Sequence, residues 1–188
     1  GWLIIFGSLP VVLVGLIFKE QIENQLRSLW VIAISLIVFG IILGIADKYG
    51  KTERQLHELT PMHGVLYGFA QSLALIPGVS RSGATIAMGR SMGYSREAAL
   101  RYSFLLALPA VFGSGLYELK GALGEAASER AFSLPETFTA TAVAFVIGYA
   151  VIAWLLKYVT TKSFAPFIIY RVILGSVLLA LLAAGVIG

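Results

Sequence analysis

Three hydroxyls and a guanidinium lie within one short run of an otherwise apolar sequence. The run, IPGVSRSGAT at residues 76–85, carries Ser80, Arg81, Ser82 and Thr85. A guanidinium binds phosphate through two parallel N–H bonds, and hydroxyls donate to the remaining oxygens. Charged side chains inside apolar segments are costly and mark functional sites. The run therefore predicts a phosphate site. The alternative is an arginine that reaches lipid headgroups, with the serines as helix N-caps.

A helix break precedes these side chains and a helix start follows them. Pro77 and Gly78 end one apolar stretch, and Gly83 lets backbone come close to a ligand. We expect the next helix to begin near Ala84, so that its free N–H groups and positive dipole end face the same point. Arginine, hydroxyls and a helix N-terminus together make a phosphate site.

Gln71 is a polar side chain inside the apolar segment that leads to the break. It is a candidate for contact with substrate or water, and an interhelical hydrogen bond is the alternative. Arg90 and Arg101 are candidates for a second phosphate contact or for ion pairs. We favour extension to the headgroups for Arg90 and expect it for Arg171, whereas the question is left open for Arg101. The remaining polar candidates, for which we expect helix-terminal or solvated positions, are Glu97, His57 and His63.

The composition is that of an integral membrane protein. Of 188 residues, 58% are hydrophobic and 13% charged, and the mean hydropathy is +0.86. A soluble domain does not have this composition. Cysteine is absent, which excludes disulfides and thiolate metal sites, and no His/Asp cluster has metal-ligand spacing. The net charge of +4 fits basic loops at a membrane surface. Nucleic-acid binding would need clustered cations on a soluble face.

Long apolar stretches predict an all-α integral membrane protein. Five stretches can cross a hydrocarbon core of about 30 Å at about 1.5 Å per residue, namely 2–18, 29–46, 98–119, 138–156 and 164–187. The stretch 62–76 is short for a span and is broken at Pro77 and Gly78, so we expect a re-entrant helix pair there. No period-two alternation indicates a transmembrane barrel. The predicted fold class is a multi-span helical bundle with one broken helix pair.

Two parts of the chain resemble each other in order and spacing. Each has an apolar run with a proline, Pro10 or Pro109, then a span that ends in Lys-Tyr, then a proline-led helix. Duplicated halves are usual in membrane proteins that form a site from broken helices. We expect one transmembrane domain over residues 1–188, with 2–61 ending a first repeat, 62–103 forming the re-entrant motif segment and 104–188 completing the second repeat. We also expect a partner motif upstream of Gly1, in a longer protein.

The sequence HGVLYGFAQSLALIPGVSRSGAT at residues 63–85 closely resembles the second signature of the bacterial undecaprenyl-diphosphate phosphatases of the bacitracin-resistance type. SREAALRYSFLLALP at residues 95–109 is also similar to that family, and the resemblance runs through nearly the whole chain. It implies a multi-pass enzyme of the bacterial cytoplasmic membrane with inverted repeats and two re-entrant helix pairs. Such an enzyme removes the terminal phosphate of a polyprenyl diphosphate at a site open to the outer face. This regenerates the monophosphate carrier for peptidoglycan.

The resemblance also implies how the motif acts. Arg81 and Ser80 are expected to be catalytic, with Arg81 stabilising transition-state charge. Gln71 lies where the family's other repeat has an essential glutamate. The residues expected to bind substrate are Ser82, Thr85, Gln71, Gly78 and Gly83. The family implies a divalent cation, Mg²⁺ or Ca²⁺, whose ligands are not identifiable in this chain. Membrane lipids are further expected partners, nucleic acid is not, and a homodimer is left open.

The family's first signature, with its glutamates, paired serines and histidine, is absent from this chain. Those residues are thought to activate the attack and to contact the divalent ion, so we expect this chain alone to be inactive. A polyprenyl-phosphate or other anion transporter is the main alternative, because it shares broken helices and duplicated halves. A structural subunit, in which Arg81 only pairs with a neighbour, is another. The phosphatidic-acid phosphatase type 2 class is excluded, because no histidine follows His63.

Overall fold

The computed structural model describes residues 2–18, 26, 28–124 and 133–187, and within them the regular structure is helical, with one isolated bridge between Arg54 and Tyr94. The elements in chain order are α1 (Trp2–Ile17), α3 (Leu29–Tyr49), the 3-10 turn η1 (Leu56–Glu58), α4 (Pro61–Ser72), the 3-10 turn η2 (Leu73–Leu75), α5 (Arg81–Ser91), α6 (Arg96–Gly124), α7 (Leu134–Val159) and α8 (Ala165–Ala183).

Four of the described helices, α3, α6, α7 and α8, are long and apolar enough to cross a membrane. They confirm an all-helical protein with several membrane spans. α1 is apolar but shorter. α4 and α5 have only 12 and 11 residues, and a helix that crosses a bilayer needs about 20. The predicted repeat boundaries stay predictions.

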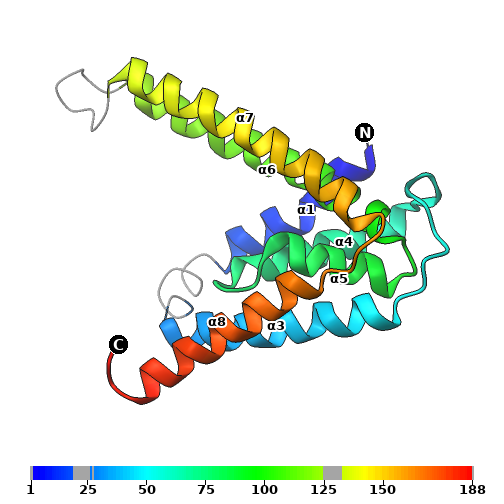
Figure 1. The fold of residues 1–188 in the computed structure, drawn as a ribbon. Helices are drawn as coiled ribbons and strands as arrows, with labels where there is room; N and C mark the ends of the chain where they lie inside the picture. Colours follow the sequence, from blue (N-terminus) through cyan, green and yellow to red (C-terminus); the bar gives the residue numbers. More distant parts are fainter. Residues whose placement is uncertain (1, 19–25, 27, 125–132, 188) are drawn as a thin grey trace.

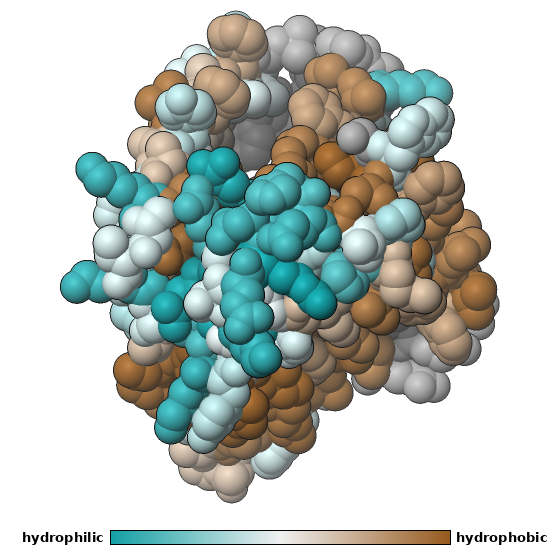
Figure 2. Space-filling model, turned by 90° about the vertical axis from the view of Figure 1, so that its right-hand side faces the viewer, coloured by the Kyte–Doolittle hydropathy of each residue, from teal (hydrophilic) through white to brown (hydrophobic). Residues whose placement is uncertain are grey.

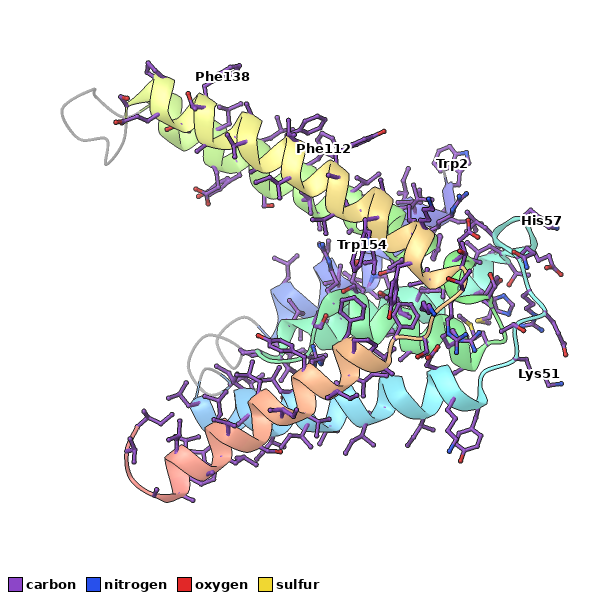
Figure 3. All side chains as sticks on the ribbon, viewed as in Figure 1. Trp2, Lys51, His57, Phe112, Phe138 and Trp154 are labelled. Carbon is purple, nitrogen blue, oxygen red and sulfur yellow. The ribbon has the colours of Figure 1, made fainter. Side chains whose placement is uncertain are left out.

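The short helices α4 and α5 lie at the centre of the molecule, between α1 and the α3–α8 pair, while α6 and α7 form a hairpin that leans away (Figure 1). Hydrophilic residues gather over the end of the molecule that carries the α3–α4 connection, and hydrophobic residues border them (Figure 2). Phe112 and Phe138 of the hairpin point away from the body (Figure 3). An apolar outer surface of this extent fits contact with lipid.

Glycines let neighbouring helices pack backbone to backbone. A Cβ on Gly68 of α4 would collide with the carbonyl of Gly7 on α1. A Cβ on Gly175 of α8 would lie 2.8 Å from the carbonyl oxygen of Ala33 on α3. Lipid is as apolar as the side chains, so membrane helices associate largely through such close van der Waals packing. These contacts hold α1 against α4 and α8 against α3.

The helix α4 begins where the sequence predicts it. Pro61 is its first residue, where the missing N–H is harmless, and the Thr60 hydroxyl caps the helix by accepting from the N–H of His63 at 3.3 Å. The helix ends at Ser72 and continues as the 3-10 turn η2. The predicted break before the motif is therefore confirmed.

The helix α5 begins at Arg81 and not near Ala84 as predicted. The Ser80 hydroxyl caps the helix by accepting from the N–H of Gly83 at 3.2 Å, so the helix begins three residues before the predicted start. The chain reaches this cap through a turn at Gly78, whose φ of 90° is in the left-handed region that favours glycine.

Replacing Gly78 with alanine should lower the free energy of unfolding by at least about 2 kcal/mol. The new Cβ would be strained at this φ and would lie 2.5 Å from the carbonyl oxygen of Ile32 on α3. Thermal unfolding of the detergent-solubilised protein measures the effect. Gly113→Ala in α6 is the matched control, since nothing lies within 4 Å of its Cβ position, and it should be neutral or slightly stabilising. Equal stability of the two variants would contradict the packing described here.

Candidate phosphate site

The hydroxyls of the predicted phosphate site lie at the N-terminus of α5. Ser80 Oγ accepts from the Gly83 N–H and lies 3.2 Å from Ser82 Oγ. The protein therefore caps the Gly83 N–H itself, so this group is not free for a ligand. Arg81 and Ser82 are the first two helical residues, and helix geometry leaves their N–H groups without an intrahelical partner. These groups and the positive end of the helix dipole form an anion-binding position.

Two cavities meet at this helix end. One has a volume of about 190 Å³ and is lined by Ser80, Ser82, Gly83 and Arg171, with mostly apolar side chains of α3, α5, α6, α7 and α8 around the rest. The other is more open, has a volume of about 350 Å³, and is lined by the 76–81 turn, including Arg81, and again by Arg171. Ser80 and Arg171 line both cavities. They therefore lie between the two cavities, where the Ser80 hydroxyl and the Arg171 guanidinium interrupt mostly apolar walls.

Arg171 is the residue of this site that the sequence reasoning missed. Its Nη2 donates to the carbonyl of Gly78 at 2.8 Å, and its Nε is buried without a hydrogen-bond partner among the described residues. The expectation that Arg171 extends to the headgroups is therefore wrong. α8 packs on α3, and the Gly78 turn also packs on α3, so the guanidinium reaches the motif. A signal was available, because an arginine within an apolar span marks a functional site by default.

Thr85 is not among the residues that line either cavity. Its side chain is fully buried, and its hydroxyl lies 2.7 Å from Ser103 Oγ on α6 and donates to the carbonyl of Arg81 at 2.9 Å. These bonds engage the hydroxyl within the protein and join α5 to α6. The predicted contact of Thr85 with a diphosphate stays a prediction, and the geometry favours a positioning residue.

Gln71 is buried behind the motif with only 1% of its side chain exposed, and neither amide atom has a hydrogen-bond partner among the described residues. The interhelical hydrogen bond offered as the alternative is therefore not seen in this part of the chain. Gln71 lies one turn after Tyr67, whose hydroxyl abuts Gly89 of α5. An unpaired buried amide costs about 1–3 kcal/mol, so Gln71 favours a bound water or ligand.

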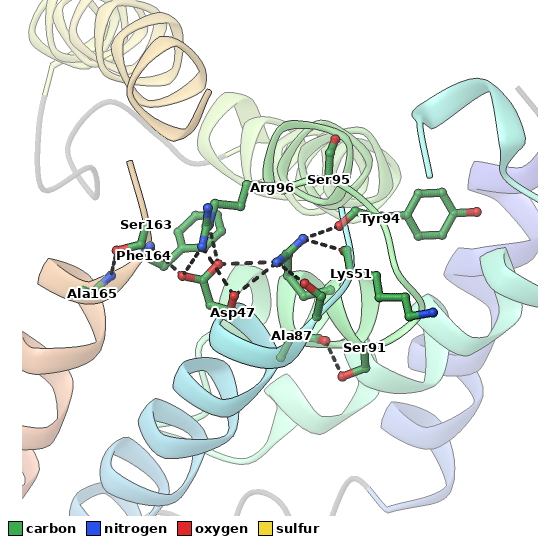
Figure 4. A network of polar contacts seen from close by, with 12 residues as sticks. Asp47, Lys51, Ala87, Ser91, Tyr94, Ser95, Arg96, Ser163, Phe164 and Ala165 are labelled. Carbon is green, nitrogen blue, oxygen red and sulfur yellow. Dashed lines mark hydrogen bonds and ion pairs between the residues drawn. The ribbon is translucent and has the colours of Figure 1, made fainter. Parts of the chain in front are cut away.

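A buried carboxylate joins four helices at the far end of α5 (Figure 4). Asp47, in the last turn of α3, is 5% exposed. Its Oδ1 lies 2.6 Å from Arg96 Nε of α6 and 3.5 Å from Arg90 Nε of α5. Its Oδ2 accepts from the N–H of Phe164, the N-cap residue of α8, at 3.2 Å. We call Asp47, Arg90 and Arg96 the carboxylate clamp.

The expectation that Arg90 extends to the headgroups is also wrong, and the alternative, an ion pair, is confirmed by its contact with Asp47. Its side chain is 1% exposed, and its guanidinium donates to four backbone carbonyls, those of Asp47, Gly50, Lys51 and Tyr94. A buried charge is tolerated only when it is paired and hydrogen-bonded. Asp47 supplies the opposite charge and the carbonyls accept from both terminal nitrogens, whereas Nε, 3.5 Å from Asp47 Oδ1, has no hydrogen-bond partner among the described residues. Because Arg90 and Ser80 lie on the same helix, the clamp fixes the position of α5 from the end opposite the phosphate site.

The other polar candidates lie away from the cavities. Arg101 and Glu97 form an exposed ion pair on α6 at 2.8 Å, which answers the question left open for Arg101. His63 lies at the Pro61 end of α4, where its Nδ1 is 2.7 Å from the hydroxyl of Tyr94. Burial, with the charge of Arg54, lowers the pKa of His63, so the ring is neutral at neutral pH.

The described residues contain no group of three or more His, Asp or Glu side chains that could hold a metal ion. Ligands for the divalent cation that the resemblance implies are therefore not identified among these residues, and no step below uses one. Neither of the two cavities is lined by a carboxylate or an imidazole in the part of the chain described. The described residues of the site thus offer hydrogen-bond donors and positive charge, and the binding of phosphate there stays a prediction.

Comparison with protein families finds a match over residues 1–177 to the family of the bacitracin resistance protein BacA. The chain belongs to the BacA family. Relatives named undecaprenyl-diphosphatase occur in Pseudarthrobacter chlorophenolicus, 58% identical, and Micrococcus luteus, 56% identical; each alignment covers the whole chain and 68% of the relative. An undecaprenyl-diphosphatase 2 of Agrobacterium fabrum is 56% identical, with 66% of it covered. The chain thus spans about two thirds of the length of these BacA relatives.

Replacing Asp47 with alanine should lower the free energy of unfolding by about 3–5 kcal/mol, because Arg90 would remain buried without its counter-charge. Thermal unfolding in detergent measures the loss. Glu97→Gln is the matched control, since it breaks an ion pair that is exposed to solvent, and such pairs contribute about 0–1 kcal/mol. An Asp47→Ala variant as stable as Glu97→Gln would show that the carboxylate clamp does not hold the helices together.

Proposed function

We propose that this chain carries the diphosphate-binding part of an undecaprenyl-diphosphatase, which converts undecaprenyl diphosphate and water to undecaprenyl phosphate and inorganic phosphate. The observation that carries the proposal is the junction at Ser80 and Arg171, where Arg171 and two hydroxyls at the N-terminus of α5 line an apolar chamber, and Arg81 lines the cavity beside it. A lipid diphosphate likewise combines an anionic diphosphate with an apolar chain. The names of the BacA relatives support the choice of substrate.

The polar side of the junction suits the diphosphate. Arg81 and Arg171 supply two permanent positive charges against the phosphate oxygens, each able to donate two parallel N–H bonds. Ser80 and Ser82 supply hydroxyls, and the start of α5 supplies free N–H groups. In surroundings of low dielectric these fixed donors interact more strongly with charge than they would in water.

The apolar side of the junction suits the lipid chain. The smaller cavity is walled by aromatic and aliphatic side chains such as Phe104 of α6, Leu155 of α7 and Phe167 of α8. Isoprenyl units next to the diphosphate would be buried there, where each buried CH₂ contributes about 0.8 kcal/mol. Polyprenyl substrates would therefore be preferred to water-soluble diphosphates.

The reaction breaks the bond between the terminal phosphorus and the bridging oxygen while a water oxygen attacks that phosphorus. The bridging oxygen leaves with the lipid monophosphate, and Arg81 and Arg171 stabilise the charge that develops on the oxygens. The group that removes the proton from water is assigned to sequence beyond the described residues, because no carboxylate or imidazole lines these cavities. Because substrate binding and proton removal are assigned to different parts of the protein, we expect the chain alone to be inactive.

The proposal extends to location and assembly. Gly78 packs against Ile32, the fourth residue of α3, which puts the motif about 5 Å inside one end of that span. We assign this end to the outer face of the bacterial cytoplasmic membrane.

α4 and α5 are the re-entrant pair of one repeat, and an inverted repeat supplies its counterpart. A divalent cation, if used, takes its ligands from that counterpart, and a homodimer is compatible with the exposed outer helices.

Replacing Arg81 with lysine in the full-length protein should reduce phosphate release from undecaprenyl diphosphate about a hundredfold, since a point charge cannot replace the paired N–H bonds. Initial rates in detergent, without a membrane gradient, measure this. Arg101→Lys is the matched control and should retain activity, because it lies in the exposed pair with Glu97. A full-length protein that releases no phosphate in detergent would favour a transporter, and an active Arg81→Lys variant would contradict the clamp on phosphate.

A further inference from the structure

A groove of about 630 Å³ lies where α3 ends, between the last turns of α3 and α5. One wall is formed by Ile42 and Ile45 of α3, which are 42% and 54% exposed. The opposite edge is formed by the following loop, with Lys51 and Arg54. The groove therefore has an apolar side and a basic side, and its volume is typical of a small-molecule site. We propose that this groove binds an anionic phospholipid.

The groove lies at the boundary of the hydrocarbon layer. α3 is a candidate membrane span that ends at Tyr49, which also lines the groove. Tyrosine is enriched at membrane–water interfaces because its ring is amphipathic. Hydrophilic residues gather over this end of the molecule, with hydrophobic residues bordering them (Figure 2), and Lys51 extends outward just past the end of α3 (Figure 3). A phospholipid at this depth would have its headgroup beside the loop.

The apolar side of the groove suits the acyl chains of a phospholipid, and the basic side suits its headgroup phosphate. The acyl chains would lie along Ile42 and Ile45, which face outward on α3. The headgroup phosphate would lie beside Lys51 and Arg54, where one carboxylate, Glu53, also lines the groove. Lys48, whose ammonium lies 5.3 Å from the ring centre of Tyr49, adds a further positive charge nearby. The basic residues outnumber the acidic one, so the charge favours an anionic headgroup over a zwitterionic one.

The groove is held in shape by the protein. Arg54 Nη1 donates to the carbonyl of Met92 at 2.6 Å, and the backbone of Arg54 pairs with Gly93 and Ser95. A guanidinium has five donors, so the bond to Met92 leaves others for a phosphate. Lys51 is tied through its carbonyl to Arg90, at 2.9 Å, while its ammonium extends outward. The basic side is therefore anchored by backbone contacts and does not need the ligand to form.

The groove is separate from the phosphate site. It borders the C-terminal end of α5, whereas Ser80 caps the N-terminal end, and an 11-residue helix is about 16 Å long. The residues of the groove line neither of the two cavities at the motif. Lipid binding and phosphate release can therefore be altered independently, and the proposal does not rest on the proposed function.

Binding of palmitoyl-oleoyl phosphatidylglycerol to the full-length protein in detergent, counted by native mass spectrometry, tests the proposal. We expect tighter binding of this lipid than of the matching phosphatidylcholine. Lys51→Gln should weaken phosphatidylglycerol binding about fivefold, the factor that corresponds to about 1 kcal/mol for each basic residue near an anionic lipid. Lys162→Gln is the matched control: Lys162 is exposed in the turn before α8, near the same end of α3, but does not line the groove. It should bind as the wild type does.

Equal binding of the two lipids by the wild type would overturn the proposal, and so would equal binding of phosphatidylglycerol by Lys51→Gln and Lys162→Gln. Inorganic phosphate is added in a third arm. If phosphate at low millimolar concentration displaces the lipid, the site recognises a free anion and not a phospholipid. Phosphate release from undecaprenyl diphosphate should be unchanged in Lys51→Gln in detergent, which confirms that the variant is folded.

Discussion

The carboxylate of Asp47 is the constraint on which the arrangement of the central helices depends. It is buried, it faces Arg90 of α5 and Arg96 of α6, and it accepts from the backbone N–H that starts α8. Removing two or three charged groups from water is expensive unless each one finds its partners, so this pairing tolerates few alternative arrangements. A single side chain of α3 therefore sets the positions of three other helices.

This constraint also positions the two helices that carry the residues of the phosphate site. α5 begins with the Ser80 cap and Arg81, and α8 carries Arg171 two turns beyond its start. Both are registered against α3, α5 through the clamp and the Gly78 turn, and α8 through Phe164 and the Gly175 contact. Arg171 and Ser80 then line the same two cavities although they are far apart in the chain. The phosphate site is thus formed by residues of α5 and α8, and each of these helices is positioned by its own contacts with α3.

Local features of this fold were predictable from the sequence. Apolar length predicts the long helices, Pro61 predicts the start of α4, and the run from Pro77 to Ser80 predicts a break followed by a helix cap. The partners of side chains on neighbouring helices were not predictable. Arg90 and Arg171 are both arginines in apolar helices, and their sequence positions do not give the carbonyls and the carboxylate that face them. For the same reason Thr85, which shares the motif with Ser82, turns out to bond Ser103 on another helix. The start of α5 at Arg81 was missed because Ser80 as an N-cap was only the alternative to Ser80 as a phosphate ligand, whereas in the structure its hydroxyl caps the helix.

The central claim is that Arg81 and Arg171 act on the same diphosphate. A double-mutant cycle in the full-length protein tests it most directly, with Arg81→Lys, Arg171→Lys and the double variant assayed for kcat/KM on undecaprenyl diphosphate. Groups that share one ligand are coupled, so the double variant should lose much less activity than the product of the two single losses, by a coupling of about 1 kcal/mol or more. A coupling free energy below about 0.3–0.5 kcal/mol would mean that the two losses are independent and would contradict the account. An Arg171→Lys variant with unchanged kcat/KM would contradict it as well.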